Sequence, residues 1–303
     1  DPRIEQLTGR AIEQVDPRLK SFGNYPRAYI SAITAASEYA SKLGNMVPHC
    51  FELRPSCYAR DPLLHALFRD VDAIYTTVRE SLDIKEFCTT QGKPEGGMVY
   101  ALMAMRRHQK TIYGPALEGD VLQPDVKKTM VYFDGHTLLL PSVSPQELRN
   151  KLVTHLFDSL ISSLAEMIKE GVSQRQALER ERDILASRAR SHPDKGELQT
   201  QLDEVRGQLA ALGSDYELVN YHKLFDQFME NPEHHLQLLC DEIPIDMRGV
   251  MRESDDRLAG RFKFFDLVGR DRRRWTLCPV RMPVEELREA MHCTAEHERW
   301  IKI

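Results

Sequence analysis

The 303-residue sequence has no long hydrophobic run and none of the short motifs that mark common enzyme sites. Apolar stretches such as residues 130–132 and 138–140 fall far short of the roughly 20 residues that a membrane-spanning helix needs. It contains no Gly-x-x-x-x-Gly-Lys loop, no Gly-x-Gly-x-x-Gly, no His-Glu-x-x-His and no Gly-x-Ser-x-Gly. We therefore expect no membrane span and no cofactor, and a non-enzymatic role is favoured over catalysis.

The sequence also lacks an excess of basic charge and a framework of paired cysteines. Its net charge is -5 and its pI is near 6.2, whereas proteins that follow a phosphate backbone are rich in clustered Lys and Arg. The six cysteines are scattered through a chain that is long enough to bury a core without disulfide bonds. These observations favour a cytoplasmic protein and make nucleic acid the less favoured partner.

Residues that could hold a metal ion occur in two groups. The first group is His49, Cys50, Cys57 and His65, and the second is Cys293 and His297. Neither group contains a Cys-x-x-Cys pair, and the second supplies only two ligands. Because scattered cysteines and histidines are more often ordinary core or surface side chains, we expect no metal site.

The first 120 residues are predicted to form a helical bundle. Apolar residues recur at helical spacing in four segments, which are residues 2–15, 24–43, 61–82 and 95–113. Gly44 is expected to end the second helix, because glycine is common just past a helix C-terminus. In the fourth segment Met98, Leu102 and Met105 share one helical face.

Residues 121–143 are predicted to form a small β-hairpin. Two strand-like runs, residues 128–133 and 136–140, flank the dipeptide Asp134-Gly135. Asp-Gly between such runs favours a two-residue type I′ turn, which requires a positive φ at both central residues.

Residues 144–230 are predicted to form a long antiparallel helical hairpin. Ser144 and Glu147 make a capping box at its start, and the break between the two helices is expected at residues 191–196. Apolar residues of the return helix alternate in steps of four and three, which is the spacing of a coiled-coil seam. These residues are Leu198, Leu202, Val205, Leu209, Leu212, Tyr216 and Val219.

The distal half of this hairpin, residues 173–212, is the predicted contact with a protein partner or with a second copy of the chain. A two-helix seam that stands alone is marginal in water and gains stability by burying its remaining apolar edge. The alternative is that the helix pair is simply part of the core of a bundle. The predicted partner-binding residues are Leu178, Leu185, Leu198, Leu202, Val205 and Leu209.

Residues 231–303 are predicted to form an α+β module. A short helix is expected to begin at Pro232, two strands over residues 261–269 and 274–282 form a second β-hairpin, and a final helix begins at Pro283.

The turn of this second β-hairpin is rich in arginine. As the wing of a winged-helix-like module it would contact phosphates through its arginines, while the tryptophan would stack on a base. The alternative is a solvated turn whose arginines pair with nearby carboxylates, because tight turns collect charge. The residues of this alternative nucleic-acid site are Arg270, Arg272, Arg273, Arg274 and Trp275.

The whole chain is therefore predicted to be mainly α: a helical bundle with a long antiparallel coiled-coil hairpin and two small β-hairpins. This architecture favours an adaptor or assembly protein. Nucleic-acid binding, which a salt-dependent affinity would reveal, is one alternative. An enzyme with an unrecognised site is the other, and it would show a pocket with convergent titratable groups.

Overall fold

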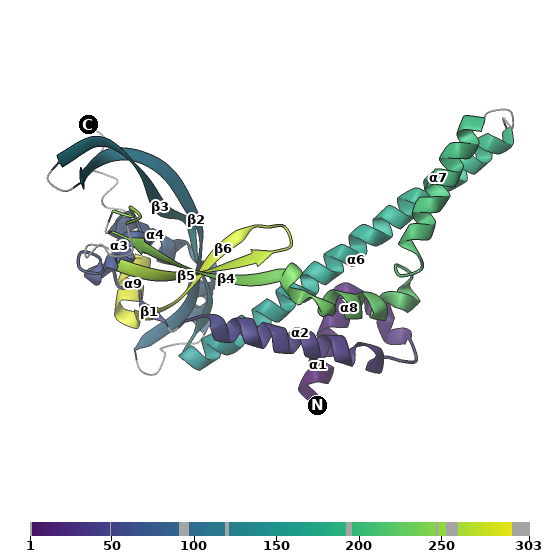
Figure 1. The fold of residues 1–303 in the computed structure, drawn as a ribbon. Coiled ribbons are helices and arrows are strands. Elements are labelled where there is room, and N and C mark those ends of the chain that lie inside the picture. Colours follow the sequence, from purple (N-terminus) through teal and green to yellow (C-terminus); the bar gives the residue numbers. More distant parts are fainter. Residues whose placement is uncertain are drawn as a thin grey trace. The chain divides into compact units, whose positions relative to one another are not determined.

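The computed structural model describes residues 2–48, 50–90, 97–118, 121–191, 196–246, 248–252 and 260–292 (Figure 1). The chain divides into two compact units. Unit 1 consists of Asp1–Lys42 and Thr154–His235, and unit 2 consists of Leu43–Val153 and Leu236–Ile303. Two helices, α2 (Arg27–Met46) and α6 (Pro145–Ser191), contribute residues to both units.

Over its described residues unit 1 contains helices and connecting turns but no strand. Besides its parts of α2 and α6, it contains α1 (Pro2–Val15), η1 (Pro17–Ser21), α7 (Gly196–Leu212), η3 (Leu218–Asn220), α8 (Tyr221–Glu230) and η4 (Pro232–His234). Its core is apolar and tightly packed: Ile12, Ile33 and Leu160 are fully buried, and the rings of Tyr29 and Phe225 meet edge to face at 5.0 Å. The predicted first helix is confirmed, since α1 covers the segment that the periodicity indicates.

Unit 2 is built on a six-stranded sheet. The strands are β1 (Phe51–Glu52), β2 (Met98–Glu118), β3 (Val121–Ser142), β4 (Leu236–Ile245), β5 (Gly260–Gly269) and β6 (Arg274–Pro283). Their order is β3-β2-β6-β5-β4, with every neighbouring pair antiparallel, and β1 pairs in parallel with β6. The helical elements of this unit are η2 (Pro55–Cys57), α3 (Pro62–Leu67), α4 (Val71–Glu80), α5 (Leu82–Thr90) and α9 (Val284–His292). Residues of the helices and of the sheet share one hydrophobic core.

The predicted fold class, a mainly α bundle with two small β-hairpins, is wrong because of this sheet. The segment 95–113, predicted as a helix, supplies most of β2. Its Met, Ala and Leu residues are good helix formers. However, β2 pairs with β3 along one edge and with β6 along the other, and residues 101–105 are all buried. Burial of both faces and pairing at both edges therefore override the intrinsic preference.

The predicted turn at Asp134-Gly135 is also wrong. Both residues lie inside β3, which continues past them, and Gly135 has φ of +63°. The register shifts here, with Ala104 opposite Thr137 and Arg106 opposite Asp134. The dipeptide thus supplies the positive φ of a β-bulge rather than that of a turn.

Two predicted helix boundaries in the first 90 residues are corrected as well. The segment 61–82 is not one helix, because Asp70 accepts a hydrogen bond from the Ala73 amide and begins α4 as a new helix. Gly44 does not end α2 but lies within it. A Cβ at Gly44 would lie 2.6 Å from Val153 Cγ2, so glycine is present because α6 passes close to this point.

The C-terminal module keeps its β-hairpin but not its first helix. β5 and β6 pair antiparallel on either side of residues 270–273, which confirms the predicted strands. The helix predicted from Pro232 is only the short η4, and β4 follows it. Leu236 and Leu238 are buried two residues apart, and so are Ile243 and Ile245, as in a strand; because the two pairs are separated by an odd number of residues, they lie on opposite faces.

The predicted helical hairpin begins and reverses where expected. The Ser144 hydroxyl accepts from the Glu147 amide at 3.2 Å, so the capping box forms. The return helix is shorter than predicted, because α7 ends at Leu212 and Gly213 follows with φ of +60°. Tyr216 and Val219, which the spacing assigns to the seam, therefore lie beyond α7 and outside the observed seam.

Candidate functional site

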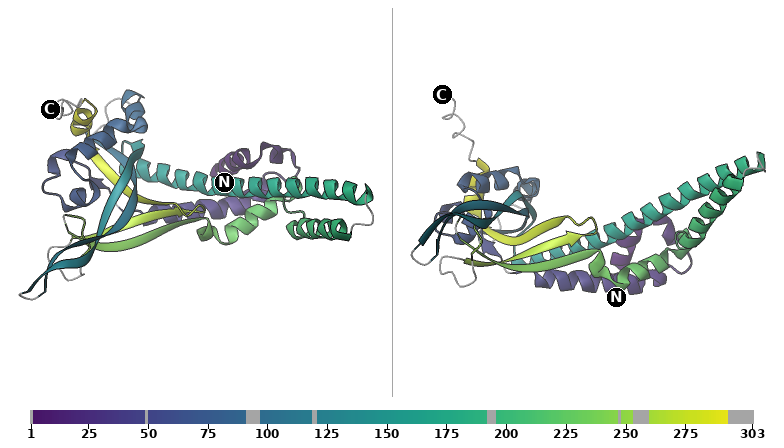
Figure 2. Two further views of the ribbon diagram at one scale, coloured as in Figure 1. Left: turned by 90° about the horizontal axis from the view of Figure 1, so that it is seen from above. Right: turned by 45° about the horizontal axis from the view of Figure 1, so that its top comes forward.

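The six predicted partner-binding residues all belong to one seam between α6 and α7. Figure 2 shows α7 alongside the distal part of α6, and the seam packs there. Leu178, Leu185, Leu202 and Val205 are buried at 9%, 7%, 3% and 6% exposure, and Leu198 and Leu209 pack against them. In this closed hairpin the six side chains contact one another. A partner would reach the four buried ones only if the helices separated, so their role in binding stays a prediction.

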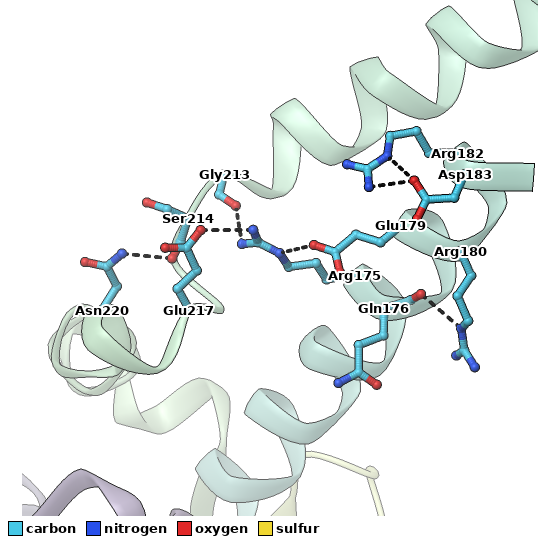
Figure 3. Close-up of polar contacts among 10 residues, drawn as sticks. All are labelled: Arg175, Gln176, Glu179, Arg180, Arg182, Asp183, Gly213, Ser214, Glu217 and Asn220. Atoms are coloured by element: carbon cyan, nitrogen blue, oxygen red, sulfur yellow. Dashed lines mark hydrogen bonds and ion pairs between the residues drawn. The ribbon is translucent and has the colours of Figure 1, made fainter. Parts of the chain in front are cut away.

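A polar network joins α6 to the segment that follows α7 (Figure 3). The Arg175 guanidinium donates to the Glu179 carboxylate at 3.0 Å, to the Glu217 carboxylate at 2.9 Å and to the Gly213 carbonyl at 3.0 Å. Hydrogen bonds from Arg175 to Glu179 and Glu217 raise the pKa of Arg175, so it keeps its charge. A cation beside the last carbonyls of α7 also complements the helix dipole. The closed geometry of the hairpin is thus held by polar contacts as well as by the seam.

The outer face of α6 carries an exposed apolar residue that the sequence analysis missed. Ile184 is 54% exposed, although it lies one residue from the buried Leu185. Arg180 and Arg188 stand four residues before and after it, on the same helical face. The signal in the sequence is this Arg-x-x-x-Ile-x-x-x-Arg spacing, which the mixed charges of the segment obscure.

The two helices of the hairpin carry opposite net charge. Between residues 173 and 191 of α6, five arginines stand against three carboxylates, which leaves +2. In α7, three carboxylates stand against one arginine, which leaves -2. Among the described residues no ion pair joins α6 to α7, and Arg180, Arg188, Glu197 and Glu204 form none at all. The charge asymmetry is therefore displayed on the surface.

The arginine turn of the β5–β6 hairpin is exposed. Arg270, Arg272, Arg273 and Arg274 are all exposed. The Arg273 guanidinium pairs with Asp271 at 3.1 Å, and the guanidinium of Arg106 lies 4.9 Å from the ring centroid of Trp275. The strand β4 precedes this hairpin and pairs with β5, whereas a winged-helix module has helices before its wing. Nucleic-acid contact at this turn stays a prediction.

No protein-family model, curated protein or solved structure matches this chain. Its function must therefore be inferred from the contacts, the burial and the charge of its own residues. Over the described ranges, every helix is too short or too polar to cross a bilayer.

The metal-capable residues do not form a site in the part of the chain that the structure describes. No group of three or more His, Cys, Asp or Glu side chains there is placed to hold an ion. His49, Cys293 and His297 lie outside the described residues. Burial, with the nearby Asp266, raises the pKa of the Cys278 thiol to about 12, so at neutral pH this cysteine is not the thiolate that binds metals.

Proposed function

We propose that this protein assembles with a second copy of itself through the hairpin of α6 and α7. The observation that carries the proposal is the matched spacing of unpaired charges on the two outer faces. Arg180 and Arg188 are eight residues apart on α6, and Glu197 and Glu204 are seven apart on α7. At about 1.5 Å per residue these separations are roughly 12 Å and 10.5 Å.

The order of these charges along the hairpin fits two copies that lie side by side with their turns pointing the same way. Arg188 lies near the end of α6 and Glu197 near the start of α7, so both are close to the turn. Arg180 and Glu204 both lie farther from it. A twofold axis would bring each arginine pair onto the carboxylate pair of the other copy, and would form the contact twice.

Ile184 provides the apolar part of this interface. It lies between Arg180 and Arg188, so the same docking that pairs the charges removes its exposed surface from water. Exposed ion pairs each contribute about 0–1 kcal/mol, so charge sets the orientation and the burial of Ile184 adds affinity. We therefore expect a weak, salt-sensitive dimer.

Sedimentation velocity of the complete chain over a range of concentrations tests the proposal. We expect a dimer at about 0.05 M salt that weakens at about 0.5 M, because screening shortens the reach of exposed charges. Two charge reversals, Arg180→Glu/Arg188→Glu and Glu197→Arg/Glu204→Arg, should each give a monomer. The chain with all four changes, or an equimolar mixture of the two variants, should regain the dimer.

A matched control variant makes the outcome decisive. Arg272→Glu/Arg274→Glu changes the net charge by the same amount as Arg180→Glu/Arg188→Glu, but on the β5–β6 hairpin. It should leave the dimer intact. A wild-type chain that stays monomeric at every concentration overturns the proposal. If that monomer nevertheless captures a different protein, and Arg180→Glu/Arg188→Glu abolishes the capture, the hairpin serves an unlike partner instead.

A further inference from the structure

A second feature, in unit 2, points to a small ligand rather than to a protein. A cavity of about 380 Å³ opens between β3, the segment before α4 and the residues that follow β4. Its volume lies within the range of about 300–1,000 Å³ that is usual for small-molecule sites. Three cations line it, Arg69, Lys110 and Arg248, and no Asp or Glu is among the described lining residues. In a chain of net charge -5, this is a local reversal of sign.

Two of these cations have no carboxylate partner within the described residues. Arg69 pairs with Asp70 at 2.7 Å and is partly neutralised. Lys110 and Arg248 are exposed and make no ion pair there, and the Lys110 ammonium lies 5.4 Å from the centroid of the Tyr132 ring. Two unpaired cations at one cavity favour an anionic occupant, and guanidinium and ammonium groups are the usual donors to phosphate.

Aromatic rings form much of the remaining wall. Tyr58 and His65 lie against each other with ring centroids 4.2 Å apart, and Tyr132 is 38% exposed. The Tyr58 hydroxyl donates to the carbonyls of Phe68 and Arg69, at 3.1 Å and 2.7 Å, which fixes the ring at the edge of the cavity. His65 lies against one face of Tyr58, and His108 stacks on one face of Tyr132 with centroids 5.0 Å apart, so a planar ligand would stack on the opposite faces of these two rings.

Arg248 is held beside β3 by a backbone contact between its neighbour Gly249 and Val131. Gly249 has φ of +74°, and a Cβ there would lie 2.5 Å from the Val131 carbonyl oxygen. The Val131 amide donates to the Gly249 carbonyl at 2.8 Å, which brings Arg248 beside β3. Asp246 completes this loop: burial acts to raise its pKa, but hydrogen bonds from Arg252 and from the Val250 and Arg248 amides outweigh burial, and the net pKa is lowered.

We propose that this cavity binds a nucleoside monophosphate, with the phosphate at Lys110 and Arg248 and the base against the aromatic wall. The unpaired cations would bind the anionic group of such a ligand, and the aromatic rings would bind its planar group. A cavity near the lower limit of the usual range fits one nucleotide rather than a strand. This site is separate in sequence and chemistry from the hairpin contact proposed above.

Isothermal titration of the complete chain with AMP, GMP, CMP and UMP tests the proposal. At least one should bind with Kd below about 1 mM, and at least tenfold more tightly than inorganic phosphate or the matching nucleoside. Lys110→Gln/Arg248→Gln should weaken that nucleotide by about tenfold to a hundredfold and leave the nucleoside unchanged. Tyr132→Leu should weaken the nucleotide and the nucleoside alike, because it removes a ring from the wall.

The matched control is Lys263→Gln/Arg288→Gln, which removes one lysine and one arginine from β5 and α9 of the same unit, outside the cavity lining. It should bind the nucleotide as the wild type does. Far-UV circular dichroism and the melting temperature confirm that each variant is folded. If none of the four monophosphates binds, or if the control loses as much affinity as the cavity variant, the proposal fails. Binding of a ten-residue single strand but of no monophosphate also overturns it, in favour of a nucleic-acid surface.

Discussion

The close approach of Tyr216 to Gly171 allows a prediction in which the sign of a mutation reverses. Gly171 lies within α6, and a Cβ at this position would meet Tyr216 Cε1 at 1.9 Å and Cζ at 2.3 Å. No real contact is that short, so Gly171→Ala must displace the Tyr216 ring. The ring belongs to the segment between α7 and α8, so the displacement disturbs the return of the chain from the hairpin.

Two opposing contributions set the size of this effect. Alanine is favoured over glycine in a helix interior by about 1 kcal/mol. Forcing a side chain out of a filled site costs about 1–3 kcal/mol. We therefore expect Gly171→Ala to lower the free energy of unfolding by up to about 2 kcal/mol in the wild type. In a Tyr216→Ala background the overlap is gone, and the same change should stabilise by about 1 kcal/mol.

A double-mutant cycle in urea, followed by circular dichroism, measures this coupling. Because the chain has two units, hydrogen exchange of amides in residues 171–180 and 214–220 should accompany it to report the local effect. Gly207→Ala is the matched control, since Gly207 lies within α7 and a Cβ added there would meet no atom within 4 Å. It should stabilise by about 1 kcal/mol in both backgrounds. If Gly171→Ala behaves like Gly207→Ala in both, the contact between Gly171 and Tyr216 is not real.

Three further predictions concern other buried groups. Burial lowers the pKa of His136, so the folded state keeps it neutral. As pH falls below about 6.5, the unfolded chain therefore binds the proton before the folded chain does, and the free energy of unfolding should drop by up to about 1.4 kcal/mol per pH unit. Urea titrations between pH 8 and 5 should show this slope in the wild type and a flatter one in His136→Gln. Arg107→Met removes the partner 2.5 Å from the buried Asp266 carboxylate and should cost about 3–5 kcal/mol in urea unfolding, which Asp266→Asn in the same chain should largely restore. Leu202→Ala, at a position 3% exposed in the seam, should cost about 2–5 kcal/mol and speed hydrogen exchange in α7, whereas Gln201→Ala should not.

Each of these has a result that would contradict it. An unchanged pH profile in His136→Gln would mean that this histidine is not held neutral by the fold. Failure of Asp266→Asn to rescue Arg107→Met would place the loss in packing rather than in an unpaired charge. Equal exchange in Leu202→Ala and Gln201→Ala would show that the seam does not hold α7 against α6.

Local signals explain why several helix starts could be predicted and why most of the sheet could not. The capping box at Ser144 and the periodicity of α1 depend on residues within one or two turns of each other. The strands depend on pairing between distant segments, such as Met98 with Pro283. Nothing within residues 95–113 reveals these partners, while their Met and Ala content favours a helix.

The same distinction applies to the candidate sites. The spacing of apolar residues predicted which side chains of α6 and α7 meet in the seam, because that spacing is local. Which face stays exposed, with Ile184 between two arginines, depends on where α7 lies. The cavity lined by Lys110 and Arg248 is still harder to predict from sequence, since these two residues come from separate parts of the chain and are brought to one cavity by the contact of Gly249 with Val131.

The length of the β2–β3 ribbon has a consequence for how this protein could vary. β2 pairs with β6 only from Met98 to Met105, and farther along it pairs with β3 alone. Among the described side chains of residues 111–115 and 123–128 none is buried, and Tyr113 is 70% exposed. Removing cross-strand pairs from this stretch would take nothing from the core. The length of the ribbon is therefore not set by the packing of the core, and chains with a shorter or longer ribbon should fold in the same way.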